Sequence, residues 1–279
     1  MADEQSVFSR PTHVRPREGT AWRRQTLSAH DTLFSVSLGG LIALAWISLF
    51  AWGLSPYGRF LSHEGLGDVG LEDGYVVILF VAGWTLMTVA MMLPTSWPLL
   101  TLFNAITRQR VDRGRLLALV ITGYLGVWTL FGLVAHTGDR MLHEMVESSA
   151  WLSSHAWLIG AGIFLFAGAY QFTPLKYRCL DKCRSPFAFI AGTWHGVDAR
   201  KEALKLGFRH GLFCLGCCWS LMLLMFAVGV GNLAWMLVLG AIMSIEKNVR
   251  WGRRLSAPLG AWLLATGGGV VLLSASPFQ

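Results

Sequence analysis

Residues 210–245 read HGLFCLGCCWSLMLLMFAVGVGNLAWMLVLGAIMSI and contain no Asp, Glu, Lys or Arg. As one helix this stretch would be about 54 Å long, at about 1.5 Å per residue. The hydrocarbon core of a bilayer is only about 30 Å thick. GVGN at 229–232 can turn the chain, because glycine adopts backbone conformations that other residues avoid. The stretch therefore predicts two antiparallel membrane helices.

Five other segments are apolar over roughly the 20 residues that a transmembrane helix needs. They lie near 33–54, from 75 onward, and near 116–137, 150–175 and 255–275. Pro94 and Pro98 should kink or end the second of them, since proline breaks the helical hydrogen-bond pattern. The expected fold is an all-α, polytopic transmembrane bundle of about seven helices.

Two shorter segments lie between the fourth and fifth predicted helices. FAFIAGTWHGV at 187–197 is too short to span a bilayer and is expected at the interface. DARKEALKLGF at 198–208 mixes charged and apolar residues, which is typical of an amphipathic surface helix.

The basic residues predict the orientation of the bundle. Of the 23 Lys and Arg residues, 21 fall in the N-terminal tail and in the loops after the second, fourth and sixth helices; Arg59 and Arg140 are the exceptions. Cytoplasmic loops carry an excess of Lys and Arg. The N-terminus is therefore predicted in the cytoplasm and the C-terminus outside. Residues 1–31 would form a basic cytoplasmic tail, and 32–279 a single transmembrane domain.

The composition supports a membrane protein. Hydrophobic residues make up 54% of the chain and charged residues 14%, against about 25% charged in ordinary soluble proteins. The net charge of +7 does not indicate nucleic-acid binding, because the basic residues lie in short loops between apolar runs. No nucleotide-binding loop is evident, so ATP-driven pumping is not expected.

The five cysteines fall in two blocks at the predicted cytoplasmic ends of helices. Cys179 and Cys183 lie in YQFTPLKYRCLDKCRSP (170–186), and Cys214, Cys217 and Cys218 lie in HGLFCLGCCWSLM (210–222). The cytoplasm is reducing, so structural disulfides are not expected there. Soft thiolates gathered at one depth predict a site for a soft metal ion.

Helical spacing adds neighbours to the thiols. At about 100° per residue, His210, Cys214, Cys217 and Met225 share one face. Thiolate with thioether favours Cu(I), whereas Zn²⁺ would use thiolates and the imidazole. The candidate metal ligands are Cys179, Cys183, Cys214, Cys217, Cys218, His210, Met222 and Met225.

Other interpretations of these residues stay open. Free cysteines and methionines such as Met87 and Met91 also serve as core packing. The spacing of Cys214 and Cys217 also fits a thiol redox pair. Glu246 is expected to reach the interface or to pair with its neighbour Lys247; the alternative places it beside the thiols.

The chain resembles an uncharacterised bacterial family of predicted metal-binding integral membrane proteins, also described as copper chaperones. The matching stretches are AMMLPT (90–95), YQFTPLKYRCLDKCRSP, HGLFCLGCCWSLM, GVGN and Glu246–Lys247. The family usually has Met at the position of Gly231. The resemblance implies a multi-pass protein of the bacterial inner membrane that binds metal through the five cysteines.

The expected function is a non-enzymatic membrane protein that holds Cu(I), with Zn²⁺ as the alternative, at a cytoplasmic-side cysteine cluster. Besides the lipid bilayer, its expected partner is a protein that donates or accepts the metal. Two alternatives remain: a membrane thiol oxidoreductase using Cys214 and Cys217, and a structural subunit with inert cysteines.

Overall fold

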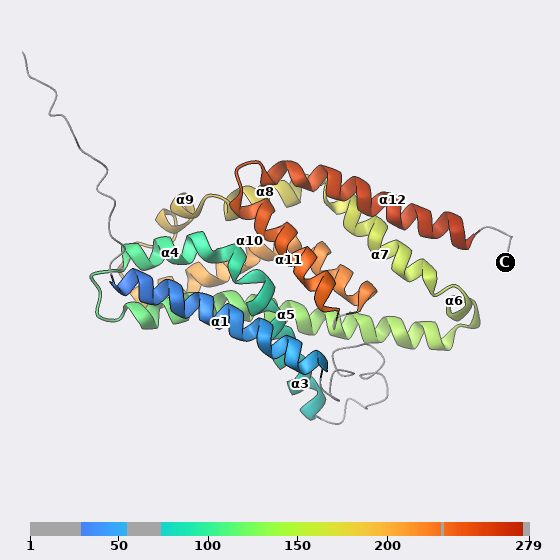
Figure 1. The fold of residues 1–279 in the computed structure, drawn as a ribbon, viewed down its shortest axis with the longest axis horizontal. Helices are drawn as coiled ribbons and strands as arrows, with labels where there is room; N and C mark the ends of the chain where they lie inside the picture. The colour runs from blue at the N-terminus through green and yellow to red at the C-terminus, as the bar shows by residue number, and fades with distance from the viewer. Residues whose placement is uncertain (1–28, 55–73, 230–231, 276–279) are drawn as a thin grey trace, which may run out of the picture.

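The computed structural model describes residues 29–54, 74–229 and 232–275, and the regular structure in these ranges is entirely helical (Figure 1). The elements are α1 (Ala29–Leu54), α3 (Gly74–Met92), η2 (Pro94–Ser96), α4 (Trp97–Ile106), α5 (Arg113–Ser148), α6 (Ala150–Ser154), α7 (Trp157–Tyr170), α8 (Pro174–Cys183), α9 (Pro186–Ala191), α10 (Ala199–Val228), α11 (Leu233–Asn248), η3 (Gly252–Leu255) and α12 (Ser256–Ser274). The all-α prediction is confirmed.

Four helical segments in these ranges are long and apolar enough to cross a membrane, and two bent helix pairs raise the number to six. The four are Thr32–Leu54, Arg113–Ser148, Ala199–Val228 and Gly252–Ser274. This is fewer than the seven expected. The sixth predicted helix corresponds to α11, whose 16 residues are shorter than the roughly 20 of an ordinary span.

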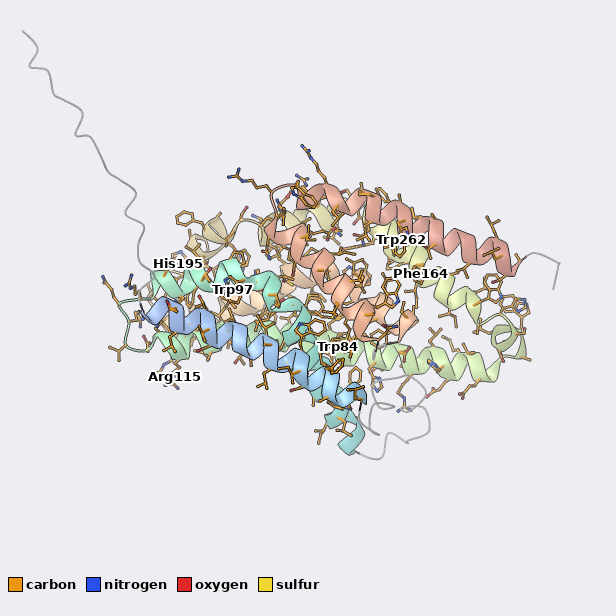
Figure 2. All side chains as sticks on the ribbon, in the orientation of Figure 1. Trp84, Trp97, Arg115, Phe164, His195 and Trp262 are labelled. Atoms are coloured by element: carbon orange, nitrogen blue, oxygen red, sulfur yellow. The ribbon has the colours of Figure 1, made fainter. Side chains whose placement is uncertain are left out.

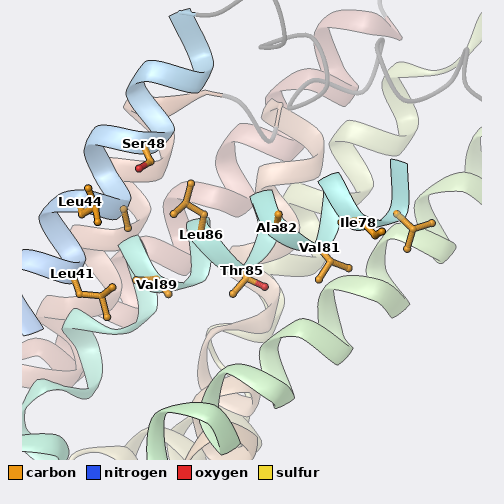
Figure 3. Close-up of a pocket in the computed structure, with 11 residues that line it drawn as sticks. Leu41, Leu44, Ser48, Ile78, Val81, Ala82, Thr85, Leu86 and Val89 are labelled. Atoms are coloured by element: carbon orange, nitrogen blue, oxygen red, sulfur yellow. The ribbon is translucent and has the colours of Figure 1, made fainter. Parts of the chain in front are cut away.

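The outward faces of the terminal helices are apolar. Leu44 and Ile47 of α1 are 60% and 65% exposed, and Leu272 of α12 is 76% exposed. A groove between α1 and α3 is lined almost wholly by aliphatic side chains, with Ser48 and Thr85 as its polar members (Figure 3). Such surfaces suit a lipid environment, since water would make their exposure unfavourable.

Prolines bend the chain twice. α3 and the segment Pro94–Ile106 meet at 44°, so the predicted break at Pro94 is confirmed. α7 and α8 meet at 66°, with Pro174 in the first turn of α8 and the Thr173 side chain accepting from the Lys176 amide at 3.3 Å. The second bend turns α8 towards α10, against which it packs.

The start of α10 corrects one prediction. Residues 198–208 do not form a separate surface helix, because α10 begins at Ala199 and continues for 30 residues. Asp198 caps it by accepting from the Lys201 amide at 3.4 Å. Ala203 and Leu206 bury the apolar face of its first turns, so an amphipathic start is continuous with an apolar helix.

The predicted turn after α10 is confirmed where the chain is described. α10 ends at Val228, Gly229 has a φ of +100°, and the Asn232 side chain caps α11 by accepting from the Trp235 amide at 3.2 Å. A positive φ of this kind is easily adopted only by glycine. Gly231, and residues 1–28 of the predicted tail, lie outside the described residues.

α10 is the central helix and packs against α5, α7, α8 and α11. Its closest approach is to α5, where a side chain at Gly207 would overlap the backbone of Val120. Small residues at such crossings let membrane helices come into backbone contact. Trp84 lies inside the bundle and donates to the Trp128 carbonyl at 2.8 Å, whereas Arg115 and His195 lie apart from each other at the same end of the molecule (Figure 2).

Candidate metal centre

Three of the cysteines lie on the buried face of α10. Cys214, Cys217 and Cys218 are each at most 1% exposed. The Cys217 sulfur lies 3.4 Å from that of Cys218, and the Cys217 thiol also donates to the Cys214 carbonyl at 3.1 Å. The spacing in CLGCC therefore gathers three sulfurs on one helix.

α8 brings the other two cysteines to the same place. The Cys183 sulfur lies 4.0 Å from that of Cys217, although the two are 34 residues apart in sequence. Cys179 packs on Gly216: a Cβ atom there would lie 2.6 Å from its sulfur. All five cysteines are free thiols. The predicted convergence of the two cysteine blocks is thus present in the structure.

Cys214 faces a buried ammonium group. The Lys247 Nζ atom of α11 donates to the Cys214 sulfur at 2.8 Å and to the Thr95 hydroxyl at 3.1 Å. The Tyr124 hydroxyl lies 3.0 Å from the same sulfur and donates to the Met92 carbonyl at 3.2 Å. All these side chains are buried. An ammonium group at this distance stabilises a thiolate over a neutral thiol.

His210 lies one helical turn before Cys214. Its Nε2 atom is 3.0 Å from the Ser96 hydroxyl, and its ring stacks on Tyr124 with centroids 5.5 Å apart. Its Nδ1 atom is buried and has no hydrogen-bond partner among the described residues. A buried ring nitrogen without a hydrogen-bond partner, as at His210 Nδ1, is uncommon in protein interiors. His210 is therefore close to the thiols, but its ring is anchored to Ser96.

Glu246 does not pair with Lys247, which corrects that prediction. Its carboxylate accepts from Lys176 of α8 at 2.8 and 3.0 Å and from Ser256 of α12 at 2.6 Å. Lys176 also bonds to Gln171, and Arg184 donates to the Glu246 carbonyl. Lys176 and Glu246 are 0% and 1% exposed. Neighbours on a helix point about 100° apart, which sends Glu246 and Lys247 to different faces.

Met222 and Met225 are fully buried on α10 beyond the thiols. Within the described ranges, no group of three or more His, Cys, Asp or Glu side chains is arranged as a ready metal site. The structure therefore brings the predicted thiol ligands together, without placing them in a coordination polyhedron, and leaves Met222 and Met225 deeper along α10.

Sequence reasoning missed five side chains in and around this centre, including Lys247, which contacts Cys214. Lys176 was counted among the basic loop residues that predict the membrane orientation. Tyr124 lies at no spacing that suggested a site. Thr95 and Ser96 come directly after Pro94, at the end of the AMMLPT stretch, and only the methionines and prolines there were interpreted from the sequence. For Thr95, Lys176 and Lys247 a signal did exist, because all three lie within stretches that matched the family.

These features define a class: an all-helical protein with several helices long enough to cross a membrane and a buried cluster of thiols beside a buried cation. More narrowly, the chain belongs to the PpoB2 copper chaperone family, which matches residues 81–270. That range includes both cysteine blocks and confirms the resemblance. Comparisons with curated proteins and with solved structures gave no match.

Proposed function

We propose that this protein is a multi-pass inner-membrane protein that binds Cu(I) at the cysteine cluster and passes it to a partner protein. The observation that carries the proposal is the contact between the Lys247 ammonium and the Cys214 sulfur. A buried cation is stable only with an anion close by. The group that faces the Lys247 ammonium is the Cys214 thiol, which becomes an anion when it loses its proton. Membership of a copper chaperone family supports copper as the cargo.

The sulfur spacing fits a shared metal ion. Metal–sulfur bonds are about 2.3 Å, so two sulfurs on one metal lie about 4 Å apart. The Cys217–Cys218 and Cys217–Cys183 separations, 3.4 and 4.0 Å, are close to this value. Small side-chain rotations would then suffice to point them at one ion. Cys214 and Cys217 are the proposed principal ligands. Cys218 and Cys183 are further sulfur donors, and Cys179 packs next to them on Gly216.

Charge balance favours Cu(I) over Zn²⁺. Two thiolates with Cu(I) carry one net negative charge, and Lys247 supplies the matching positive charge. With Zn²⁺ the same set would carry one unbalanced positive charge inside an apolar bundle, which is costly. His210, the imidazole that zinc would recruit, bonds to Ser96 through Nε2, which leaves only its Nδ1 atom for a metal. Met222 and Met225 add thioethers deeper along α10 than the thiols. Thioethers also prefer Cu(I).

The proposed topology has the N-terminus and the thiols on the cytoplasmic side. The support is the asymmetry of basic residues. In this arrangement the short helix α11 is the sixth crossing element, paired with α10 through the turn at 229–232, and the chain ends outside. The thiols then meet a reducing compartment that keeps both the cysteines and Cu(I) reduced.

Elemental analysis of the full chain, purified without oxygen in detergent, tests the proposal. The Cys214→Ser/Cys217→Ser variant should lose its copper and its thiolate–copper ultraviolet absorption, while circular dichroism shows unchanged helicity. Met145→Ser, which removes an exposed sulfur from α5, is the matched control and should bind as the natural chain does. Full copper content in the double variant would refute the proposal. Mixed disulfides formed through Cys214 or Cys217 in place of copper would favour a thiol oxidoreductase.

A further inference from the structure

Seven of the ten methionines are buried in the bundle core, each at most 1% exposed. They come from α3, α10 and α11: Met87, Met91, Met92, Met222, Met225, Met236 and Met243. By contrast, Met141 and Met145 of α5 are 60% and 54% exposed. The buried thioethers are thus gathered in three helices, and all three helices reach the level of Cys214.

Three contacts define that level. Lys247 of α11 contacts the Cys214 sulfur of α10, and Tyr124 joins the same sulfur to the carbonyl of Met92 in α3. α10 passes through this level and continues beyond Cys214, α3 ends at it, and α11 reaches it through the Lys247 side chain. At about 1.5 Å per residue, Met87 lies about 8 Å deeper than the end of α3, and Met222 and Met225 lie about 12 and 16 Å deeper than Cys214 along α10.

Two contacts place the methionine-bearing faces of α3 next to those of α10 and α11. The Trp84 and Phe226 rings of α3 and α10 lie 5.7 Å apart. Met87 and Met222 are each one turn from these rings on the side towards Cys214, so they share the facing surfaces. A Cβ atom on Gly240 would lie 3.6 Å from the Met91 side chain. Met236 and Met243 lie one turn to either side of Gly240, so α11 presents two further thioethers around Met91.

We propose that this methionine core is a second Cu(I) position, deeper in the bundle than the thiols and continuous with them. The inference rests on the proposed function, since the ion would enter through the thiol cluster. Thioethers are soft and uncharged, so they suit Cu(I) and offer little to Zn²⁺ or to harder ions. Trp84, one helical turn before Met87 on α3, adds an aromatic ring whose face can attract a cation. Neutral ligands hold the ion less strongly than thiolates, so an ion in the core exchanges readily.

Titration of Cu(I) into the full chain, purified without oxygen, tests this position. Two quantities are followed: thiolate–copper absorption, and total copper retained at equilibrium during dialysis against buffered Cu(I). In the natural chain the absorption should saturate before the retained copper does. Met87→Leu/Met222→Leu should keep the absorption and lose the copper that binds after saturation. Met236→Leu/Met243→Leu should do the same, and both changes conserve side-chain volume. Met141→Leu/Met145→Leu, on the exposed face of α5, should match the natural chain.

The possible results separate the two proposals. If the retained copper stops rising when the absorption saturates, or if both core variants retain as much copper as the natural chain, the methionine position is refuted and the thiol site stands. If the thiolate–copper absorption never appears but the core variants still lose copper, the thiol site is refuted and the methionine position stands.

Discussion

Glu246 and Lys247 are neighbours in sequence, but they take part in two different kinds of buried site. Glu246 faces α8 and α12 and is fully matched by Lys176 and Ser256. Lys247 faces α10 and the break after α3, where its ammonium contacts the Cys214 sulfur and the Thr95 hydroxyl. The first is a closed ion pair, and the second joins a cation to a nucleophilic, metal-binding group.

The difference shows that the Glu246 side of α11 stabilises the fold, whereas the Lys247 side faces the proposed metal-binding thiols. A carboxylate paired with an ammonium has its charge satisfied and gains nothing from a metal ion. A thiol beside an ammonium can change its charge, and a thiolate binds soft metals. Disturbing the Glu246 side should therefore cost stability, whereas disturbing the Lys247 side should cost copper binding.

The largest expected effect is on stability. Lys176→Met leaves the Glu246 carboxylate buried without its cation, and breaking a buried pair in this way costs about 3–5 kcal/mol. Chemical unfolding of the detergent-solubilised protein measures the loss. The paired variant Lys176→Met/Glu246→Met removes both charges and should recover much of it. If Lys176→Met unfolds at the same denaturant concentration as the natural chain, the ion pair is not the structural element assumed here.

A smaller effect is expected where α8 docks on α10. Gly216→Ala would place a methyl group against the Cys179 sulfur, and overpacking of this kind costs about 1–3 kcal/mol. Because α8 carries Cys179 and Cys183, copper affinity should fall as well. Gly126→Ala, with no side chain or backbone within 4 Å of the added carbon, is the control and should be at least as stable as the natural chain. A neutral Gly216→Ala would mean that α8 tolerates displacement.

The smallest stability effect belongs to the Lys247 side. Tyr124→Phe removes the hydroxyl that lies against Cys214 and donates to the Met92 carbonyl. One hydrogen bond contributes about 0.5–1.5 kcal/mol, so the unfolding midpoint should shift only slightly, while the copper affinity changes more. Tyr177→Phe on α8 is the matched control and should change neither. A large loss of stability in Tyr124→Phe would place this tyrosine among the structural groups.

The sequence predicted the parts of the fold that depend on apolar length and on proline. The uncharged runs located the main helices, Pro94 marked the bend after α3, and GVGN marked the turn after α10. The first ten residues of α10 were missed as part of that helix because Arg and Lys interrupt the apolar run. Such side chains can keep their charges in water while their stems lie along an apolar helix.

The site was predictable only in its sulfur content. The equal depth of the two cysteine blocks and the helical spacing within them predicted one shared site. In the structure the Cys183 sulfur lies 4.0 Å from the Cys217 sulfur. The charges were not predictable in the same way. Lys176 is buried because the chain bends by 66° at Pro174 and folds α8 inward. No count of basic residues in a loop reveals such a bend.

The most direct test of the central claim is the Cu(I) affinity of Lys247→Met, measured by competition with a Cu(I) chelator under reducing conditions. Lys247 acts on the metal through Cys214, and loss of such a supporting group typically weakens metal binding about 10–100-fold. The account predicts a loss of that size with helicity intact, and no loss in Lys182→Met, which removes an exposed lysine from α8. An affinity in Lys247→Met equal to that of the natural chain would contradict it.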